Sequence, residues 1–241
     1  MIEGGTYWLV GASEGLGRAL AQRLDAEGCK LILSARSEPR LSELAQTLIS
    51  DARVVPVDLS DAISIQAAVD QVGDAFDGLI YCAGQYDPSA APDWSPEPVE
   101  RMADVNFNGA LRILGRTVPQ MVQRGPGHIV IIGSLAGFTG LPNAIGYGAS
   151  KAAVMHLAEN LQADLRNTQI KVQLANPGFI RTRLTDKNSF KMPFLMEPEQ
   201  AADHVFRAMR SRRFSTSFPM LFSWFFRLAR FLPRRLLVRL F

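Results

Sequence analysis

Alternation of two sequence patterns is the feature that most limits the possible folds of this chain. Short, continuously apolar runs cover residues 6–10, 30–34, 53–57, 78–82, 128–133 and 170–175, and a last run is expected at about 214–218. Between them, helical patterns lie near residues 15–27, 38–49, 61–73, 97–124 and 147–166. Apolar strands joined by helical crossovers form parallel sheets that are buried on both faces. The pattern therefore predicts a doubly wound α/β fold of about seven strands, with helices on both faces.

The chain of 241 residues suits one large domain, which we expect to cover residues 1–218, followed by a distinct tail at 219–241. Residues 85–98 have the composition of a surface loop. Residues 183–197 lack periodicity but are apolar around 190–196, so we expect a lid there and call it the lid segment.

The cysteine and histidine residues give no sign of a metal site. Cys29 and Cys82 both lie in apolar runs, which is typical of reduced core thiols in a reducing compartment. The three histidines are scattered over the chain: His128, His156 and His204. Because the first strand is expected from about Thr6, we also expect no signal peptide and a cytoplasmic protein.

A glycine-rich loop follows the first expected strand and opens the first expected helix. In Gly11-x-x-x-Gly15-x-Gly17, the first glycine permits a tight turn, the second lets a pyrophosphate approach the backbone, and the third allows close helix–sheet packing. Ser13 and Leu16 lie within the same loop. The strand–loop–helix context favours a Rossmann-type dinucleotide site over a glycine-rich turn without a ligand.

The residues after the second strand favour NADP(H) over NAD(H). Ser34-Ala35-Arg36 contains no acid for the ribose 2′-hydroxyl, and a guanidinium suits a 2′-phosphate. The alternative is that Arg36 is a solvated loop residue. Glu14 would either repel a 2′-phosphate or pair with Arg36. Asp58, followed by Leu59, would either accept from the adenine amino group or serve as a turn acid, and both interpretations stay open.

Tyr147 and Lys151 are four residues apart on an expected helix, so their side chains point the same way. A phenol with a pKa near 10 exchanges protons poorly at neutral pH, whereas a neighbouring ammonium favours the phenolate and lowers that pKa. The pair could move a proton to or from a carbonyl or alcohol oxygen. A lone YxxxK is a weak signal, but the glycine-rich loop and polar markers at consistent distances strengthen it.

Together these residues resemble the short-chain dehydrogenase/reductase family over about residues 6–185. The resemblance rests on Gly11-x-x-x-Gly15-x-Gly17, Asp58-Leu59, Cys82-Ala83-Gly84, Asn106, Ser134, Tyr147-x-x-x-Lys151 and Pro177-Gly178-x-x-x-Thr182. It implies direct hydride transfer between a nicotinamide cofactor and a carbonyl or alcohol. It does not identify the substrate.

The resemblance also implies a role for each polar marker. Tyr147 is the general acid of reduction or the base of oxidation, and Ser134 orients the substrate oxygen. Lys151 binds the nicotinamide ribose and lowers the pKa of Tyr147, while Asn106 holds a water that relays protons. Taken singly, each has a structural alternative: Ser134 as a turn cap, Asn106 as a cap or kink, Tyr147 as a half-buried aromatic, and Lys151 as a solvated lysine.

Further cofactor contacts are implied after the fourth and sixth strands. The implied residues are Ala83, Gly84, Tyr147 and Lys151, and at the nicotinamide end Pro177, Gly178, Ile180 and Thr182. This chain has Cys82 where the family often has asparagine. Because a thiol cannot replace the hydrogen bonds of an amide, we expect a looser strand contact or pocket wall but no loss of a proton-transfer group. Family members are commonly dimers or tetramers, so a homo-oligomer is a further expectation.

The tail differs from the body in charge and pattern. Residues 204–241 hold nine arginines and no acid, leaving seventeen basic against twenty-three acidic residues elsewhere. One helical face carries Ser223, Arg227, Arg230 and Arg234, and the remainder carries Met220, Leu221, Trp224, Phe225, Leu228 and Phe231. The apolar run 218–226 is far short of the ~20 residues that span a bilayer. Two interpretations remain: an in-plane helix on a membrane surface, or a helix packed on protein with solvated arginines. Nucleic acid is disfavoured.

The sequence therefore predicts an NADP(H)-dependent oxidoreductase acting on a carbonyl or secondary alcohol, with the apolar lid segment favouring a hydrophobic or lipid-like substrate. The alternative is a non-enzymatic dinucleotide-binding protein that attaches to a membrane or partner through its tail. Under either hypothesis the protein would be cytoplasmic, with peripheral attachment to the inner face of a membrane as a further option.

Overall fold

A sheet of seven parallel strands forms the centre of the molecule. The computed structural model describes residues 4–188, 190–229, 231 and 235. The strands lie in the order β3-β2-β1-β4-β5-β6-β7. Their bounds are β1 Thr6–Val10, β2 Lys30–Ser34, β3 Arg53–Val54, β4 Gly78–Tyr81, β5 Gly127–Ile132, β6 Ile170–Pro177 and β7 Ser215–Phe218. The strand order reverses between β1 and β4, where the carboxyl ends of the strands leave a place for ligands. The expected doubly wound fold is confirmed.

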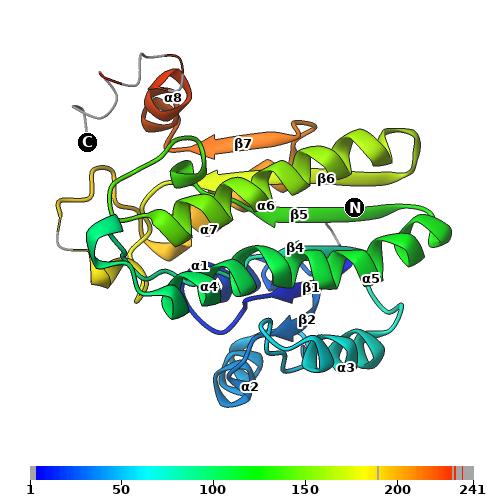
Figure 1. Ribbon diagram of the computed structural model, residues 1–241. Helices are drawn as coiled ribbons and strands as arrows, with labels where there is room; N and C mark the ends of the chain where they lie inside the picture. Colours follow the sequence, from blue (N-terminus) through cyan, green and yellow to red (C-terminus); the bar gives the residue numbers. More distant parts are fainter. Residues whose placement is uncertain (1–3, 189, 230, 232–234, 236–241) are drawn as a thin grey trace.

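Helices cover both faces of the sheet (Figure 1). On one face, α1, α2 and α7 enclose one apolar core, and on the other α3, α5 and α6 enclose a second, with α4 packed on α6. The bounds are α1 Gly15–Asp25, α2 Glu38–Thr47, α3 Ala62–Val72, α4 Pro96–Ala103, α5 Gly109–Arg124, α6 Ile145–Asp164, α7 Pro198–Arg210 and α8 Met220–Ala229. Shorter turns are η1 Ala91–Asp93, the π-helical η2 Asp104–Asn108, η3 Leu135–Gly137, η4 Leu165–Asn167 and η5 Thr185–Lys187.

Two elements differ from the sequence expectation for local reasons. The third strand is only Arg53–Val54, because Pro56 has no amide hydrogen. The amides of Val55 and Val57 still donate to the carbonyls of Leu33 in β2 and of Ala35 just after it. The single helix expected over 97–124 is divided into α4, the π-helical η2 and α5. The π-helical turn changes the direction in which its side chains point.

The helix α7 was not predicted, although its signals are present in the sequence. Glu197 and Gln200 form a capping box, and Pro198 occupies the first turn. The buried residues recur at helical spacing, as Ala201, Ala202, Val205, Phe206 and Met209. These signals follow directly after the aperiodic lid segment, which obscured the start of the helix.

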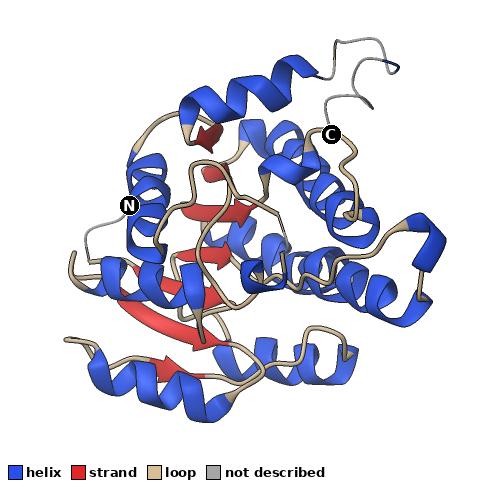
Figure 2. Cartoon of the chain, turned by 90° about the vertical axis from the view of Figure 1, so that its left-hand side faces the viewer, coloured by secondary structure: helices blue, strands red, loops and turns tan. Residues whose placement is uncertain are grey.

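The tail helix α8 lies outside the sheet edge formed by β7 (Figures 1 and 2). Ser223 and Phe226 are buried and Arg227 is half-buried, whereas the exposed side chains are Met220, Leu221, Trp224, Phe225, Leu228 and Phe231. The predicted division into two faces holds, but the prediction of solvated arginines is wrong for Arg227, since the Ser217 hydroxyl on β7 offers the guanidinium a hydrogen bond. Arg230 and Arg234 lie outside the described residues. None of the helices in the described ranges is both long and apolar enough to cross a membrane.

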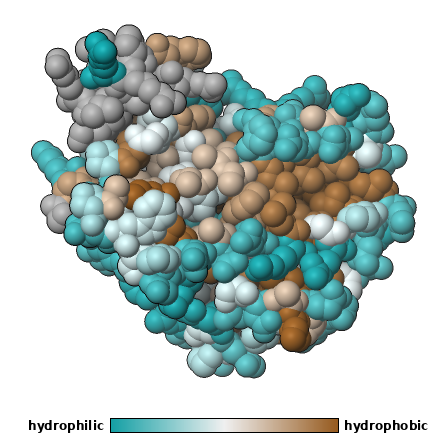
Figure 3. Space-filling model, viewed as in Figure 1, coloured by the Kyte–Doolittle hydropathy of each residue, from teal (hydrophilic) through white to brown (hydrophobic). Residues whose placement is uncertain are grey.

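A second apolar surface lies over α5 and α6. Figure 3 shows apolar side chains gathered in a band on this face. Leu111 and Val122 on α5 are exposed there, while Val118, Leu157 and Leu161 are partly buried against the core.

Candidate active site

The turn between β1 and α1 is closely packed between its neighbours. Gly11 has φ +95°, and its amide donates to the Ser34 carbonyl at 2.7 Å. A Cβ on Gly11 would lie 2.5 Å from the Ala83 nitrogen, and one on Gly17 would lie 1.9 Å from the Gly11 oxygen. Only glycine fits these two positions, and the N-terminus of α1 opens at the carboxyl edge of the sheet. Such a cradle fits a pyrophosphate group.

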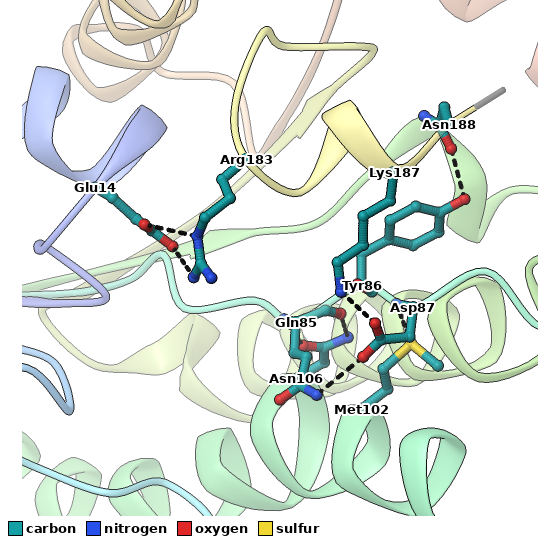
Figure 4. Close-up of polar contacts among 9 residues, drawn as sticks. All are labelled: Glu14, Gln85, Tyr86, Asp87, Met102, Asn106, Arg183, Lys187 and Asn188. Atoms are coloured by element: carbon teal, nitrogen blue, oxygen red, sulfur yellow. Dashed lines mark hydrogen bonds and ion pairs between the residues drawn. The ribbon is translucent and has the colours of Figure 1, made fainter. Parts of the chain in front are cut away.

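Glu14, beside this turn, does not form the ion pair that was one of the two expectations for it. Its carboxylate accepts from Arg40 at 2.9 Å and from Arg183 at 2.6 and 3.1 Å (Figure 4 shows the contact with Arg183). The expected pairing of Glu14 with Arg36 is therefore wrong, because the two other guanidinium groups occupy the carboxylate. Arg36 is exposed after β2, and no hydrogen bond or ion pair of Arg36 occurs within the part of the chain that is described.

Asp58 forms a turn. Its Oδ1 accepts from the Ser60 amide at 2.9 Å and from the Ser60 hydroxyl at 2.6 Å. These hydrogen bonds from Ser60 hold the pKa of Asp58 below its usual value. Leu59 beside it is buried. The turn role is thus present, and the contact to adenine stays a prediction.

Ser134 and Tyr147 are brought together by β5 and α6. Ser134 follows β5 and caps η3, its Oγ accepting from the Ala136 amide at 3.1 Å. Its hydroxyl also lies near the phenol of Tyr147 in the first turn of α6. Burial raises the pKa of Tyr147, and the interaction with the Ser134 hydroxyl opposes that rise. The capping alternative for Ser134 and the contact with Tyr147 hold at the same time.

Lys151 lies one turn further along α6 and is buried. Its Nζ donates to the Ile132 carbonyl at 2.9 Å and lies 6.0 Å from the centroid of the Tyr147 ring. Burial lowers the pKa of Lys151 to about 8. The expected lowering of the Tyr147 pKa by this ammonium is not found, because burial of the phenol dominates and the ammonium points at a backbone carbonyl. The alternative of a solvated lysine is also wrong.

Asn106 is fully buried in η2 and links three elements. Its Oδ1 accepts from the Gln85 amide at 2.7 Å, and its Nδ2 donates to the Gln85 carbonyl at 3.0 Å and to Ser150 Oγ at 2.9 Å (Figure 4 shows the contact with Gln85). A methyl group on Gly84 would lie 3.6 Å from Lys151 Nζ and 3.9 Å from Asn106 Oδ1. Gly84 therefore leaves open the space beside both side chains.

Cys82 does not loosen the strand contact. Its amide donates to the Val10 carbonyl at 2.8 Å, so the backbone between β1 and β4 stays joined beyond the last paired residues. The expected loosening at that contact is therefore wrong, because a backbone bond and not the side chain holds the strands. Burial raises the pKa of the Cys82 thiol to about 12, and the thiol interacts electrostatically with Lys151. The thiol is thus neutral at physiological pH.

The segment after β6 folds back over the glycine-rich turn. The Gly178 amide donates to the Phe218 carbonyl at 2.8 Å, and Ile180 forms a β-bridge with Met196. A Cβ on Gly15 would meet Thr182 Cγ2 at 2.8 Å. Pro177, the last residue of β6, starts this return, and of the residues expected at the nicotinamide end Thr182 lies beside the start of α1.

Sequence reasoning missed Tyr86. Its ring lies 5.0 Å from the Tyr147 ring at 76°, and its hydroxyl donates to Asn188 Oδ1 at 2.7 Å (Figure 4). Lys187 forms an ion pair with Asp87 and donates to the Tyr86 carbonyl at 3.1 Å. The lid segment is thereby fastened to the loop after β4. An aromatic residue two positions after the Cys82-Ala83-Gly84 motif was the available signal.

The family follows from a comparison of the whole chain. Residues 6–192 match the family model described as short chain dehydrogenase. The chain belongs to the short-chain dehydrogenase family. A curated relative described as an uncharacterized oxidoreductase, from Myxococcus xanthus, is 35% identical over 238 residues, which cover 96% of this chain and 94% of the relative.

Solved members of the family share the fold along nearly all of the chain. A short-chain dehydrogenase from Sphingobium yanoikuyae in complex with NADPH has a TM-score of 0.83 at 28% identity, covering 90% of this chain and 88% of that one. A short-chain dehydrogenase/reductase from Burkholderia phymatum in complex with NAD has a TM-score of 0.85 at 26% identity, covering 95% and 94%. Within the described residues, no three His, Cys, Asp or Glu side chains gather to hold a metal ion.

Proposed function

We propose that this short-chain dehydrogenase is an NADP(H)-dependent oxidoreductase that interconverts a hydrophobic carbonyl compound and its secondary alcohol. The observation that carries the proposal is that the Ser134 hydroxyl lies close enough to the Tyr147 phenol, at the carboxyl edge of the sheet, to lower its pKa. Lys151 lies beside this pair, and the glycine-rich turn opens at the same edge. A proton donor, a hydroxyl that can orient an oxygen and a cofactor cradle thus share one region.

The chemistry of the side chains follows from their protonation. When bound, the nicotinamide cofactor supplies the hydride for the carbonyl carbon. The Ser134 hydroxyl holds the carbonyl oxygen, and the Tyr147 phenol gives that oxygen its proton. Because burial raises the pKa of Tyr147, the phenol is protonated at neutral pH, which suits reduction. Lys151 binds the ribose, and Asn106 keeps the loop at Gln85 in position while relaying protons through a water.

The preference for NADP(H) rests on charge. Arg40 and Arg183 neutralise Glu14, which removes the repulsion that this carboxylate would exert on a 2′-phosphate. Arg36 stays available at the end of β2 for a charge-assisted hydrogen bond to that phosphate. The two solved relatives bind NADPH and NAD, so the fold accommodates either cofactor. The preference of this chain would therefore depend on the side chain of Arg36. Asp58 and Leu59 would bound the adenine side, and Ala83 and Gly84 the ribose side.

A hydrophobic substrate is favoured by the aromatic residues around Tyr147. Tyr86 packs against Tyr147, and the ring of Phe179 lies 5.7 Å from that of Phe190 in the lid segment. Phe194 of the same segment stacks on the tail helix. With NADPH and ketones of increasing chain length, kcat/KM should rise by about threefold or more per added CH₂ until the site is filled.

Replacement of Tyr147 tests the proton donor. Tyr147→Phe should lower kcat/KM with NADPH by about 10²- to 10⁴-fold over a panel of ketones, while NADPH affinity measured by fluorescence titration stays within about threefold. Tyr86→Phe, which also removes one phenol hydroxyl, is the matched control and should lose far less. Unchanged turnover in Tyr147→Phe would reject the assignment. Tight NADPH binding without turnover of any carbonyl by the unmodified protein would favour the non-enzymatic alternative.

Replacement of Arg36 tests the cofactor preference. Arg36→Asp should weaken NADPH binding by about 10- to 100-fold and leave NADH binding equal or tighter. Arg166→Asp, at a hollow by the amino end of β6, is the matched control and should move neither affinity. A ratio of the two affinities that does not change in Arg36→Asp would remove the basis for NADP(H).

Self-association through α5 and α6 is a related inference. The apolar band there includes the exposed Leu111 and Val122, and apolar bands of this kind are typical of subunit contacts. Sedimentation equilibrium should give an oligomer that dissociates in Leu111→Lys/Val122→Lys. The exposed Ile49, replaced by Lys, is the control. A monomeric unmodified protein at all concentrations would reject this inference.

A further inference from the structure

The outward half of α8 is apolar and exposed. Five side chains, each between 41% and 78% exposed, follow one another around this half: Met220, Leu221, Trp224, Phe225 and Leu228. Phe231, just after the helix, is 78% exposed. The spacing of the first five by one, three and four residues puts them on one continuous surface of the helix. Contiguous aromatic and aliphatic surface of this kind marks a binding site in a soluble domain.

The polar residues of the same helix point the other way. Ser223 is buried and its hydroxyl donates to the Met220 carbonyl at 2.7 Å, while Arg227 donates to Ser217 Oγ at 3.0 Å. The Arg227 guanidinium also lies 5.4 Å from the centroid of the Phe138 ring. The same inward side also buries Phe226, so the contact of α8 with the body leaves the outward apolar side chains exposed.

The lid segment continues this surface. The ring of Phe222 lies 5.5 Å from that of Phe194 and 6.0 Å from that of Phe179. Phe194 is 59% exposed and Phe190, whose ring contacts Phe179, is 51% exposed. The lid segment also holds Tyr86 against Tyr147 through Asn188. One aromatic surface thus runs from the tail to the segment that borders the candidate active site.

The charge of the tail complements an anionic surface. From His204 to the end of the chain there is no acidic residue, and the sequence after α8 carries Arg230, Arg234, Arg235 and Arg239. Aromatic residues at the head-group level and nearby arginines are the combination that binds in-plane helices to anionic bilayers. A two-fold contact between copies through this surface would instead bring like-charged arginine segments together.

We propose that the outward face of α8 and the exposed Phe190 and Phe194 dock on the surface of an anionic lipid bilayer. The lid segment then faces the acyl chains. If the proposed function is correct, a hydrophobic carbonyl compound dissolved in the bilayer would enter the site without crossing bulk water. Docking itself does not depend on the catalytic assignment, so its test uses binding and not turnover.

Co-sedimentation with vesicles tests the docking. The full chain should sediment with vesicles of equal parts phosphatidylcholine and phosphatidylglycerol and bind pure phosphatidylcholine at least about tenfold more weakly. Binding should fall when added salt shortens the screening length from about 10 Å to about 3 Å. The triple variant Leu221→Ser/Trp224→Ser/Leu228→Ser should lose at least about tenfold in partitioning, because three apolar side chains no longer leave water.

The matched control removes the same kinds of side chain elsewhere. Ile49→Ser/Ile63→Ser/Trp94→Ser replaces two exposed aliphatic residues and one exposed tryptophan away from the tail, and should bind vesicles like the unmodified chain. Equal loss in both triple variants would overturn the proposal. So would a chain that binds no vesicles, or an oligomer that dissociates only in the α8 triple variant, which would assign the surface to a second copy.

Tryptophan fluorescence locates the contact. The chain has three tryptophans, of which Trp8 is fully buried and Trp94 and Trp224 are exposed. In Trp94→Phe, anionic vesicles should shift the emission to shorter wavelength and protect it from iodide, because Trp224 enters the head-group region. Trp94→Phe/Trp224→Phe should show neither change. Emission from Trp224 that is unaffected by vesicles which sediment the protein would place the contact elsewhere and overturn the proposal.

Discussion

The helices α7 and α8 have similar amphipathic patterns and opposite orientations. In α7 the apolar side is buried, as with Val205 and Phe206, and Arg207 and Arg210 are exposed. In α8 the half-buried Arg227 faces β7, and the apolar Leu221 is exposed. The two helices are separated in sequence only by β7, yet α7 buries most of its apolar side chains, whereas α8 buries Phe226 and leaves most of the others exposed.

This difference teaches that a pattern identifies the two faces of a helix but not the direction in which they point. The direction depends on the neighbouring surface. Packing against α1 gives α7 an apolar neighbour and places Arg23 over the Phe206 ring at 4.2 Å. For α8, the neighbouring surface offers the Ser217 hydroxyl and the Phe138 ring, both of which accommodate a guanidinium.

Matched phenylalanine substitutions give the largest expected contrast between the two helices. Phe206→Ala should lower the free energy of unfolding by about 3–5 kcal/mol, because this ring is 1% exposed in a close-packed core. Phe225→Ala, where the ring is 41% exposed, should cost less than about 1 kcal/mol. Urea unfolding measures both. Similar losses would show that α8 buries its outer face in the protein and would break the comparison.

The body should also respond to acid in a way that the tail does not. His128 is buried between Tyr7 and Gln173, and burial lowers its pKa to about 4. Since the unfolded chain takes up this proton near pH 6.5 and the folded chain only near pH 4, stability should fall by on the order of 3 kcal/mol as the pH drops through that window. Urea unfolding at several pH values measures the slope.

The controls for this slope use other histidine positions. His128→Gln should lose most of it, whereas His156→Gln should keep it, because His156 is exposed. Deletion of residues 219–241 should leave the slope unchanged, since the tail contains no residue with a lowered pKa among those described. A slope that persists in His128→Gln would assign the acid sensitivity to other groups.

Replacement of two arginines gives the smallest expected contrast. The two changes in the free energy of unfolding should have opposite signs. Arg23 bonds Glu27 at 2.6 Å and Asp203 at 2.7 Å, whereas Arg227 has a buried Nε without a hydrogen-bond partner. Arg23→Met should destabilise by up to about 1 kcal/mol. Arg227→Met should be neutral or stabilising by a similar amount, because it removes a partly unpaired charge and keeps the apolar stem. A clear destabilisation by Arg227→Met would show that its contact with Ser217 outweighs the burial of the charge.

Much of the fold was predictable because strands buried on both faces are continuously apolar. The runs at β1, β2 and β5, and the glycine-rich turn whose glycines leave no room for a Cβ, are local signals. Ser134 and Tyr147 meet because β5 ends and α6 begins at the same edge, which the topology already implies.

The remaining features depend on pairings between distant loops, which no local pattern encodes. Glu14 bonds Arg183, more than 160 positions away, instead of the nearby Arg36. Tyr86 is held by Asn188 of the lid segment. The raised pKa of Tyr147 depends on how deeply the phenol is buried, and the orientation of α8 depends on its contacts with Ser217 of β7 and with the Phe138 ring.

The ion pair between Glu14 and Arg183 joins the glycine-rich turn to the segment that folds back over it. If a nucleotide occupies that turn, this exposed ion pair has to dissociate each time the nucleotide binds or is released. Dissolved salt screens the attraction between the two charges. Higher ionic strength should then hasten exchange in both directions, so that the speed of turnover and the tightness of nucleotide binding respond differently to salt.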